Sequence, residues 1–171
     1  MSELTAPVRI EGGPVADGFL AGIGRSAVGS HERFTEIQQQ VLLLASLGGT
    51  TEEVAGLLAC NEVEITDARD SLIEIYGARN TAEVVSKAIL GRHLPIEVSS
   101  DPGLRLSRRD IVLLDGFRHG LSNKEIGRHK QIGKSKDIVR QRYSWPLFAK
   151  IGANGRTHSV RRSYELGIWP I

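Results

Sequence analysis

The amino-acid sequence predicts an all-α protein: two tandem four-helix domains preceded by a flexible N-terminal tail. Two observations lead to this fold class. Apolar residues recur at three- and four-residue spacing from Phe34 onward, as they do on the buried face of an amphipathic helix. The order of helix signals in residues 34–91 then returns in residues 105–171, which indicates an internal duplication.

The tail and the first domain come first in the chain. Residues 1–33 contain six Gly and two Pro without clear periodicity, a composition typical of a flexible tail. Residues 34–91 are expected to form the first domain, and residues 92–104 read as a linker. Stop and capping residues delimit the four helices of this domain, in order Gly48, Gly49, Thr50, Glu53, Asn61, Gly77, Asn80, Glu83 and Gly91.

The second domain, residues 105–171, repeats these signals at an offset that grows along the chain. Ser122 with Glu125 repeats the capping box of Thr50 with Glu53 at an offset of 72 residues. By the last helix the offset has reached 76 residues. The added residues are expected in the turn at Gly133-Lys134, near Pro146 and after Gly152. Because this drift is confined to turns and a proline, we interpret the pattern as a real duplication.

The charge of the chain is divided between its halves. The formal net charge is only +2, yet residues 1–103 hold 7 Lys or Arg against 15 Asp or Glu, whereas residues 104–171 hold 15 against 5. The first domain alone carries 3 basic and 9 acidic residues. Such asymmetry favours nucleic-acid binding by the basic half.

Composition also excludes several classes of protein. A lone Cys60, expected as a core thiol, cannot build a disulfide framework or a Cys-based zinc site. No apolar run approaches the roughly 20 residues that cross a bilayer, and no secretory signal is evident. No nucleophile–base set or metal-ligand spacing stands out, so we expect no enzymatic activity, cofactor, metal or membrane partner. A cytoplasmic, nucleoid-associated protein is expected.

One run of residues carries a family resemblance. Gly120-Leu121-Ser122-Asn123-Lys124-Glu125-Ile126 resembles the C-terminal DNA-binding domain of LuxR-type response regulators, a four-helix helix-turn-helix fold. The resemblance extends over residues 106–168, and residues 34–91 resemble the same family more loosely. It implies tandem helix-turn-helix domains, with the third helix of the second domain in the major groove of double-stranded DNA.

The resemblance also implies site residues. Base readout is implied for Lys136, Arg140, Gln141 and Ser144 on the outer face of that helix, whose N-cap is expected at Ser135. Arg can pair bidentately with guanine and Gln with adenine. Phosphate contacts are implied for Ser122, Asn123, Lys124, Arg128, Lys130, Lys134, Ser135, Arg142, Arg156, Arg161 and Arg162.

Pro146 departs from the family pattern, because it falls inside the expected reading helix. Proline removes a backbone donor at a cost of roughly 3 kcal/mol in a helix interior, so the helix is expected to bend or to end near Tyr143. Four aromatic residues are concentrated in the second domain, and we expect them to pack in its core: Tyr143, Trp145, Phe148 and Tyr164.

The first domain has acids where the second has its candidate reading residues. Thr66, Asp67 and Asp70 match Arg140, Gln141 and Ser144, and the same helix carries Glu62, Glu64 and Glu74. We expect this domain to keep the fold without contacting DNA. Dimerisation, binding of a protein partner and autoinhibition stay open as its role. Its last helix resembles the family's dimerising helix in Val84, Val85, Ala88 and Ile89, which could equally close the domain core.

The function expected from these features is sequence-specific binding of double-stranded DNA in transcriptional regulation, as a monomer or a homodimer. Two alternatives remain. The protein could be a phage or mobile-element factor for excision, replication or immunity. It could instead be a protein-interaction module that binds RNA polymerase, with the acidic domain as a DNA mimic.

Overall fold

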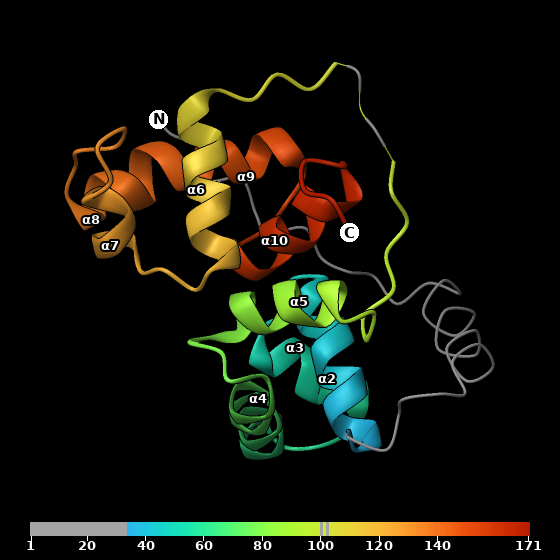
Figure 1. Cartoon of the computed structure of the whole chain (residues 1–171). Coiled ribbons are helices and arrows are strands. Elements are labelled where there is room, and N and C mark those ends of the chain that lie inside the picture. Colours follow the sequence, from blue (N-terminus) through green and yellow to red (C-terminus); the bar gives the residue numbers. More distant parts are fainter. Residues whose placement is uncertain (1–33, 100, 102) are drawn as a thin grey trace, which may run out of the picture. The chain divides into compact units, whose positions relative to one another are not determined.

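The computed structural model of the protein describes residues 34–99, 101 and 103–171, and the tail expected at residues 1–33 lies outside them. Within these described ranges every regular element is a helix, which confirms the all-α class. Residues Thr35–Ile171 form one compact unit, shown in Figure 1. Among its helices, none is long and apolar enough to cross a membrane.

Four helices follow one another in the first part of this unit, and we call them the first helix set. They are α2 (Glu36–Ser46), α3 (Thr51–Leu58), α4 (Glu62–Tyr76) and α5 (Thr81–Leu90). The side chains of Thr35, Thr50, Asn61 and Asn80 cap their N-termini. The caps predicted at Thr50, Asn61 and Asn80 are therefore confirmed.

The second helix set repeats this order. Its first, second and fourth helices are α6 (Arg108–Arg118), α7 (Asn123–Gly127) and α10 (Arg156–Glu165). Its third helix is long and consists of three consecutive segments, α8 (Lys136–Ile138), η2 (Val139–Ser144) and α9 (Trp145–Ile151). Ser122 caps α7 through the predicted box with Glu125. Ser135 has the extended backbone of an N-cap, although its hydroxyl makes no capping bond.

The third helix of the second set continues through Pro146, so the expected end near Tyr143 is wrong. Ser144 and Trp145 both keep right-handed helical dihedral angles. The segment Val139–Ser144 is instead a π-helical turn, in which the Trp145 N–H donates to the carbonyl of Arg140 five residues earlier. A π turn holds one residue more than an α-turn, and Pro146, which has no N–H, follows directly after it.

The core is mostly aliphatic, with Phe117, Phe148 and Tyr164 buried in the second set, and it extends across both helix sets. Val41, Val54, Ile65 and Leu72 are buried in the first set, and Leu113, Ile126, Val139 and Leu147 in the second. Helices α5 and α10 pack against each other, as Figure 1 shows. Between the sets, the described residues of the expected linker 92–104 form no helix, and Leu94 is buried.

Candidate nucleic-acid interface

The outer face of the long third helix in the second set is the candidate reading surface. Lys136, Arg140 and Gln141 are all exposed along it. None of the three forms an ion pair with another residue in the described ranges. Their guanidinium, ammonium and amide groups therefore keep the free donors and acceptors that recognition of base edges requires.

Ser144 does not belong to this surface, so its expected outward position is wrong. Its side chain is 5% exposed, and its hydroxyl donates to the carbonyl of Val139 at 3.0 Å. The π-helical turn is the physical reason. It inserts one residue between Val139 and Ser144, which turns every later side chain of the helix by about 100° relative to a regular α-helix.

Trp145 lies at the outward position that the sequence predicts for Ser144. Its side chain is 55% exposed, so its expected place in the core is also wrong, whereas Phe148 and Tyr164 are buried as expected. The Trp145 ring stands edge-on to Phe148, with 6.1 Å between centroids. The offset between the two repeats grows by one residue near Pro146, and this growth indicates the shift of the outward position from Ser144 to Trp145. With that residue counted, Asp70 of the first set matches Trp145.

Exposed cations surround the reading surface. They lie on α7, in the following turn and on η2, and none pairs with a carboxylate of the described residues: Lys124, Arg128, Lys130, Lys134 and Arg142. Ser122 and Ser135 are exposed beside them. A hollow of about 240 Å³ opens between the starts of α7 and α8, and is lined by Ser122, Asn123, Lys124, Lys136, Asp137 and Arg140. The expected phosphate-binding residues of α7 and the reading residues of α8 and η2 thus share one continuous surface.

Arg156 is held inside the second helix set instead of facing this surface. It donates to the Leu121 carbonyl at 2.6 Å and to the side-chain oxygen of Asn123. Its guanidinium also lies 4.6 Å from the ring centroid of Phe117 in α6. Burial lowers the pKa of Arg156. Arg156 thus binds protein groups through both terminal nitrogens in this structure, and the phosphate contact expected for it stays a prediction.

Arg161 and Arg162 are likewise used within the fold. Both pair with Glu165, at 2.5 and 2.7 Å. Arg161 is 6% exposed and also donates to the Ser46 hydroxyl, while Arg162 donates to the carbonyl of Ile151. Burial of Arg161 takes its guanidinium away from the exposed surface, whereas Arg162 stays partly exposed, and its phosphate contact stays a prediction.

Two contacts fix the long third helix on α6. Lys150 pairs with Asp110 at 2.7 Å, and the Arg109 guanidinium lies 4.4 Å from the ring centroid of Tyr143. The pKa of Asp110 is raised by burial, but bonds from Lys150 and Ser107 outweigh that effect and lower it overall. The reading surface is thus presented on a helix attached at both the π turn and its C-terminal end.

The matching helix of the first set, α4, presents the opposite charge. Thr66, Asp67 and Asp70 are exposed. The exposed side chains of Glu62, Glu64 and Glu74 extend the acidic face. The one cation of α4, Arg69, turns away from solvent to donate to Thr51 and to the Gly49 carbonyl. Within the part of the chain that the structure describes, the carboxylates on the outer face of α4 form no ion pair.

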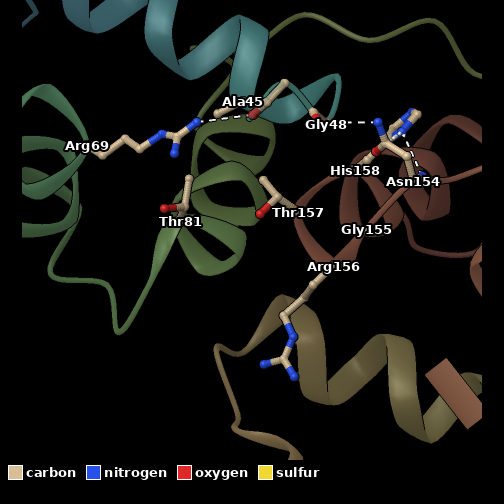
Figure 2. Close-up of a pocket in the computed structure, with 10 residues that line it drawn as sticks. Ala45, Gly48, Arg69, Thr81, Asn154, Gly155, Arg156, Thr157 and His158 are labelled. Atoms are coloured by element: carbon tan, nitrogen blue, oxygen red, sulfur yellow. Dashed lines mark hydrogen bonds between the residues drawn. The ribbon is translucent and has the colours of Figure 1, made fainter. Parts of the chain in front are cut away.

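A second hollow, of about 140 Å³, lies where α10 begins, beside α4 and the turn after α2. Figure 2 shows Arg156 extending away from its other lining residues. Burial lowers the pKa of His158, another lining residue. Arg69 and Arg156 each donate from both terminal guanidinium nitrogens to protein carbonyls and side chains, so neither presents a free guanidinium end to this hollow.

The remaining candidate residues do not form a site. Cys60 is half-buried, whereas the sequence predicts a thiol within the core. Val84, Val85, Ala88 and Ile89 are buried within the chain, which agrees with the core-closing alternative for α5.

Comparisons with protein-family models, with curated proteins and with solved structures found no match to this chain.

Proposed function

We propose that the protein binds double-stranded DNA sequence-specifically and regulates transcription, with the second helix set as its DNA-binding domain. One observation carries this proposal. The exposed face of a long helix presents Lys136, Arg140 and Gln141, bordered by five further exposed cations, and none of these side chains has a partner among the residues that the structure describes. Such a surface combines the cations that attract phosphates with side chains suited to base edges.

The proposed roles follow from side-chain chemistry. Arg140 donates two bonds to guanine O6 and N7, and Gln141 pairs with the N6 and N7 edge of adenine. Trp145 offers an apolar surface to a thymine methyl group at the end of the reading surface. Lys124, Arg128, Lys130, Lys134 and Arg142 neutralise phosphates. The Ser135 hydroxyl and the backbone N–H groups at the start of α7, after Ser122 and at Asn123, donate hydrogen bonds to them.

Both helix sets are proposed to be LuxR-type helix-turn-helix domains. The order of four helices, the repeated capping boxes and the run Gly120–Ile126 support this assignment. The first set is proposed to have lost DNA contact, because phosphates would meet Asp67, Asp70 and three glutamates on α4. The proposed location is the nucleoid of the cytoplasm.

The experiment is selection of bound duplexes from random DNA with the full chain, followed by Arg140→Ala and Gln141→Ala. Each variant should weaken binding to the selected site by about 1–3 kcal/mol and relax the preference at one base, while non-specific binding stays nearly unchanged. Arg105→Ala, an exposed cation outside the reading surface, is the matched control. Unchanged affinity of both variants for the selected site would refute base readout by this helix and favour a protein-interaction module.

A further inference from the structure

Two similar hydrogen bonds cross between the helix sets, from the N-cap of α5 and from the residue before the N-cap of α10. The Asn80 side-chain amide, just before α5, donates to the carbonyl of Gly120 at 2.8 Å. The Asn154 side-chain amide, just before α10, donates to the carbonyl of Gly48 at 3.2 Å, as Figure 2 shows. Gly48 and Gly120 each end the first helix of their set and lie 72 residues apart in the sequence.

Both glycines are required by this crossing contact. Their φ angles are 92° at Gly48 and 67° at Gly120, a region that favours glycine. A Cβ atom at Gly48 would overlap the Asn154 amide, and one at Gly120 would lie 2.7 Å from Glu83 Oε2. The two sets therefore approach each other closely at equivalent positions on both sides of their contact.

The contact between α5 and α10 has the same two-sided character. These are the last helices of their sets, and each buries its apolar face in the chain, with Val85 and Val160 both 0% exposed. The buried hydroxyls of Ser86 and Tyr164 lie 2.9 Å apart across the contact. An interface in which equivalent elements meet reciprocally is the isologous type found in two-fold symmetric dimers.

We infer that the chain is an internal pseudo-dimer, and that it binds DNA as a single molecule on one asymmetric half-site. This inference rests on the proposed function. The pseudo-two-fold relation that pairs α5 with α10 also relates α4 to the reading helix α8–η2–α9. In a symmetric dimer both such helices read DNA and select a palindrome. Here the second position belongs to α4, whose carboxylates repel the duplex.

The first test measures the selected DNA site and the stoichiometry of the complex with the full chain. Sequences selected from random duplexes should share one non-palindromic motif, and sedimentation of the complex should give one chain per duplex. A palindromic motif bound by two chains would overturn the pseudo-dimer inference and leave the proposed function intact. Selection that enriches no motif at all would instead refute the proposed function.

The second test asks whether α4 lies beside the bound duplex. Asp67→Asn with Asp70→Asn removes two exposed charges from α4, and Glu36→Gln with Glu97→Gln removes two charges outside α3 and α4. The α4 double variant should bind the selected duplex about threefold tighter than the control at low salt, the size expected when two charges lie about one Debye length from phosphates. Equal tightening by both pairs would overturn the two-fold placement of α4.

Discussion

Ser144 and Trp145 are neighbours in the chain with opposite surroundings. The Ser144 hydroxyl is buried against the carbonyl of Val139, and the Trp145 ring is more than half exposed beyond it. A residue at the end of the candidate reading surface must reach solvent, and only Trp145 does. The Ser144 hydroxyl thus stabilises the π-helical turn, and the exposed Trp145 ring is available to contact a ligand.

We predict that Trp145→Ala weakens binding to the selected DNA roughly five- to tenfold, the range of one lost apolar base contact. Ser144→Ala should change DNA affinity less than about twofold, while lowering the free energy of unfolding by about 0.5–1.5 kcal/mol through its lost hydrogen bond. Fluorescence anisotropy and denaturant melts of both variants check this. A larger DNA effect from Ser144→Ala than from Trp145→Ala would contradict the shifted register.

At the scale of single elements, α7 connects the two helix sets through its cap. Glu125 accepts bonds from the backbone N–H and hydroxyl of Ser122, at 2.7 Å each, and pairs with Arg79 of the first set at 2.5 Å. The Ser122 hydroxyl and the Arg79 guanidinium lower the pKa of Glu125 to about 2. Its carboxylate therefore stabilises both the start of α7 and the contact between the sets.

The pH dependence of stability follows from this shift. A carboxyl with a lowered folded pKa stabilises the protein fully above its unfolded value of about 4.5, and the stabilisation is lost as pH falls toward 2. The melting-temperature difference between the protein and Glu125→Gln should therefore be largest above pH 5 and shrink by pH 2.5. Glu52→Gln, which removes a carboxylate that forms no ion pair among the described residues, is the control. A difference that stays constant with pH would refute the linkage.

At the scale of the whole molecule, the charge asymmetry becomes a spatial division between the helix sets. Only some of the fifteen cations after residue 103 remain at the surface, since Arg156, Arg161 and Arg162 bind protein groups. Most of the exposed ones lie on α7, α8, η2 and the turn between α7 and α8, while Arg105, Arg108 and Arg109 are exposed elsewhere. The surface available to phosphates is thus smaller than the sequence count implies.

This smaller surface predicts a specific salt dependence. If Lys124, Arg128, Lys130, Lys134 and Arg142 each neutralise one phosphate, the log–log slope of affinity against salt is about −4 to −5. Each single Ala substitution among them should reduce the slope by about 0.9. Titrations of the selected duplex between about 50 and 200 mM salt measure it, with Arg105→Ala as the unchanged reference. A slope near zero would mean that phosphates contribute little.

The sequence predicted the helical class, the helix starts and the outward Arg140 and Gln141, because capping residues and apolar spacing act locally. The sequence-based prediction failed for side chains whose position depends on packing between distant segments of the chain. Arg161 donates a hydrogen bond to the hydroxyl of Ser46, which lies 115 residues earlier in the chain. No local sequence pattern reveals such a contact. Ser144 differs from its expected position because the π-helical turn adds one residue to the helix, and the sequence shows that residue only as a growth of the repeat offset near Pro146.

The Asn80–Gly120 and Asn154–Gly48 contacts join two helix sets of the same chain, so their pairing responds to dilution differently from the pairing of two separate subunits. Two separate subunits part when their concentration falls below the dissociation constant of the dimer. Here the short segment 92–104 joins the partners, which keeps each at an effective concentration near the millimolar range seen by the other. The pairing of the two helix sets is therefore independent of how many copies of the protein a cell contains.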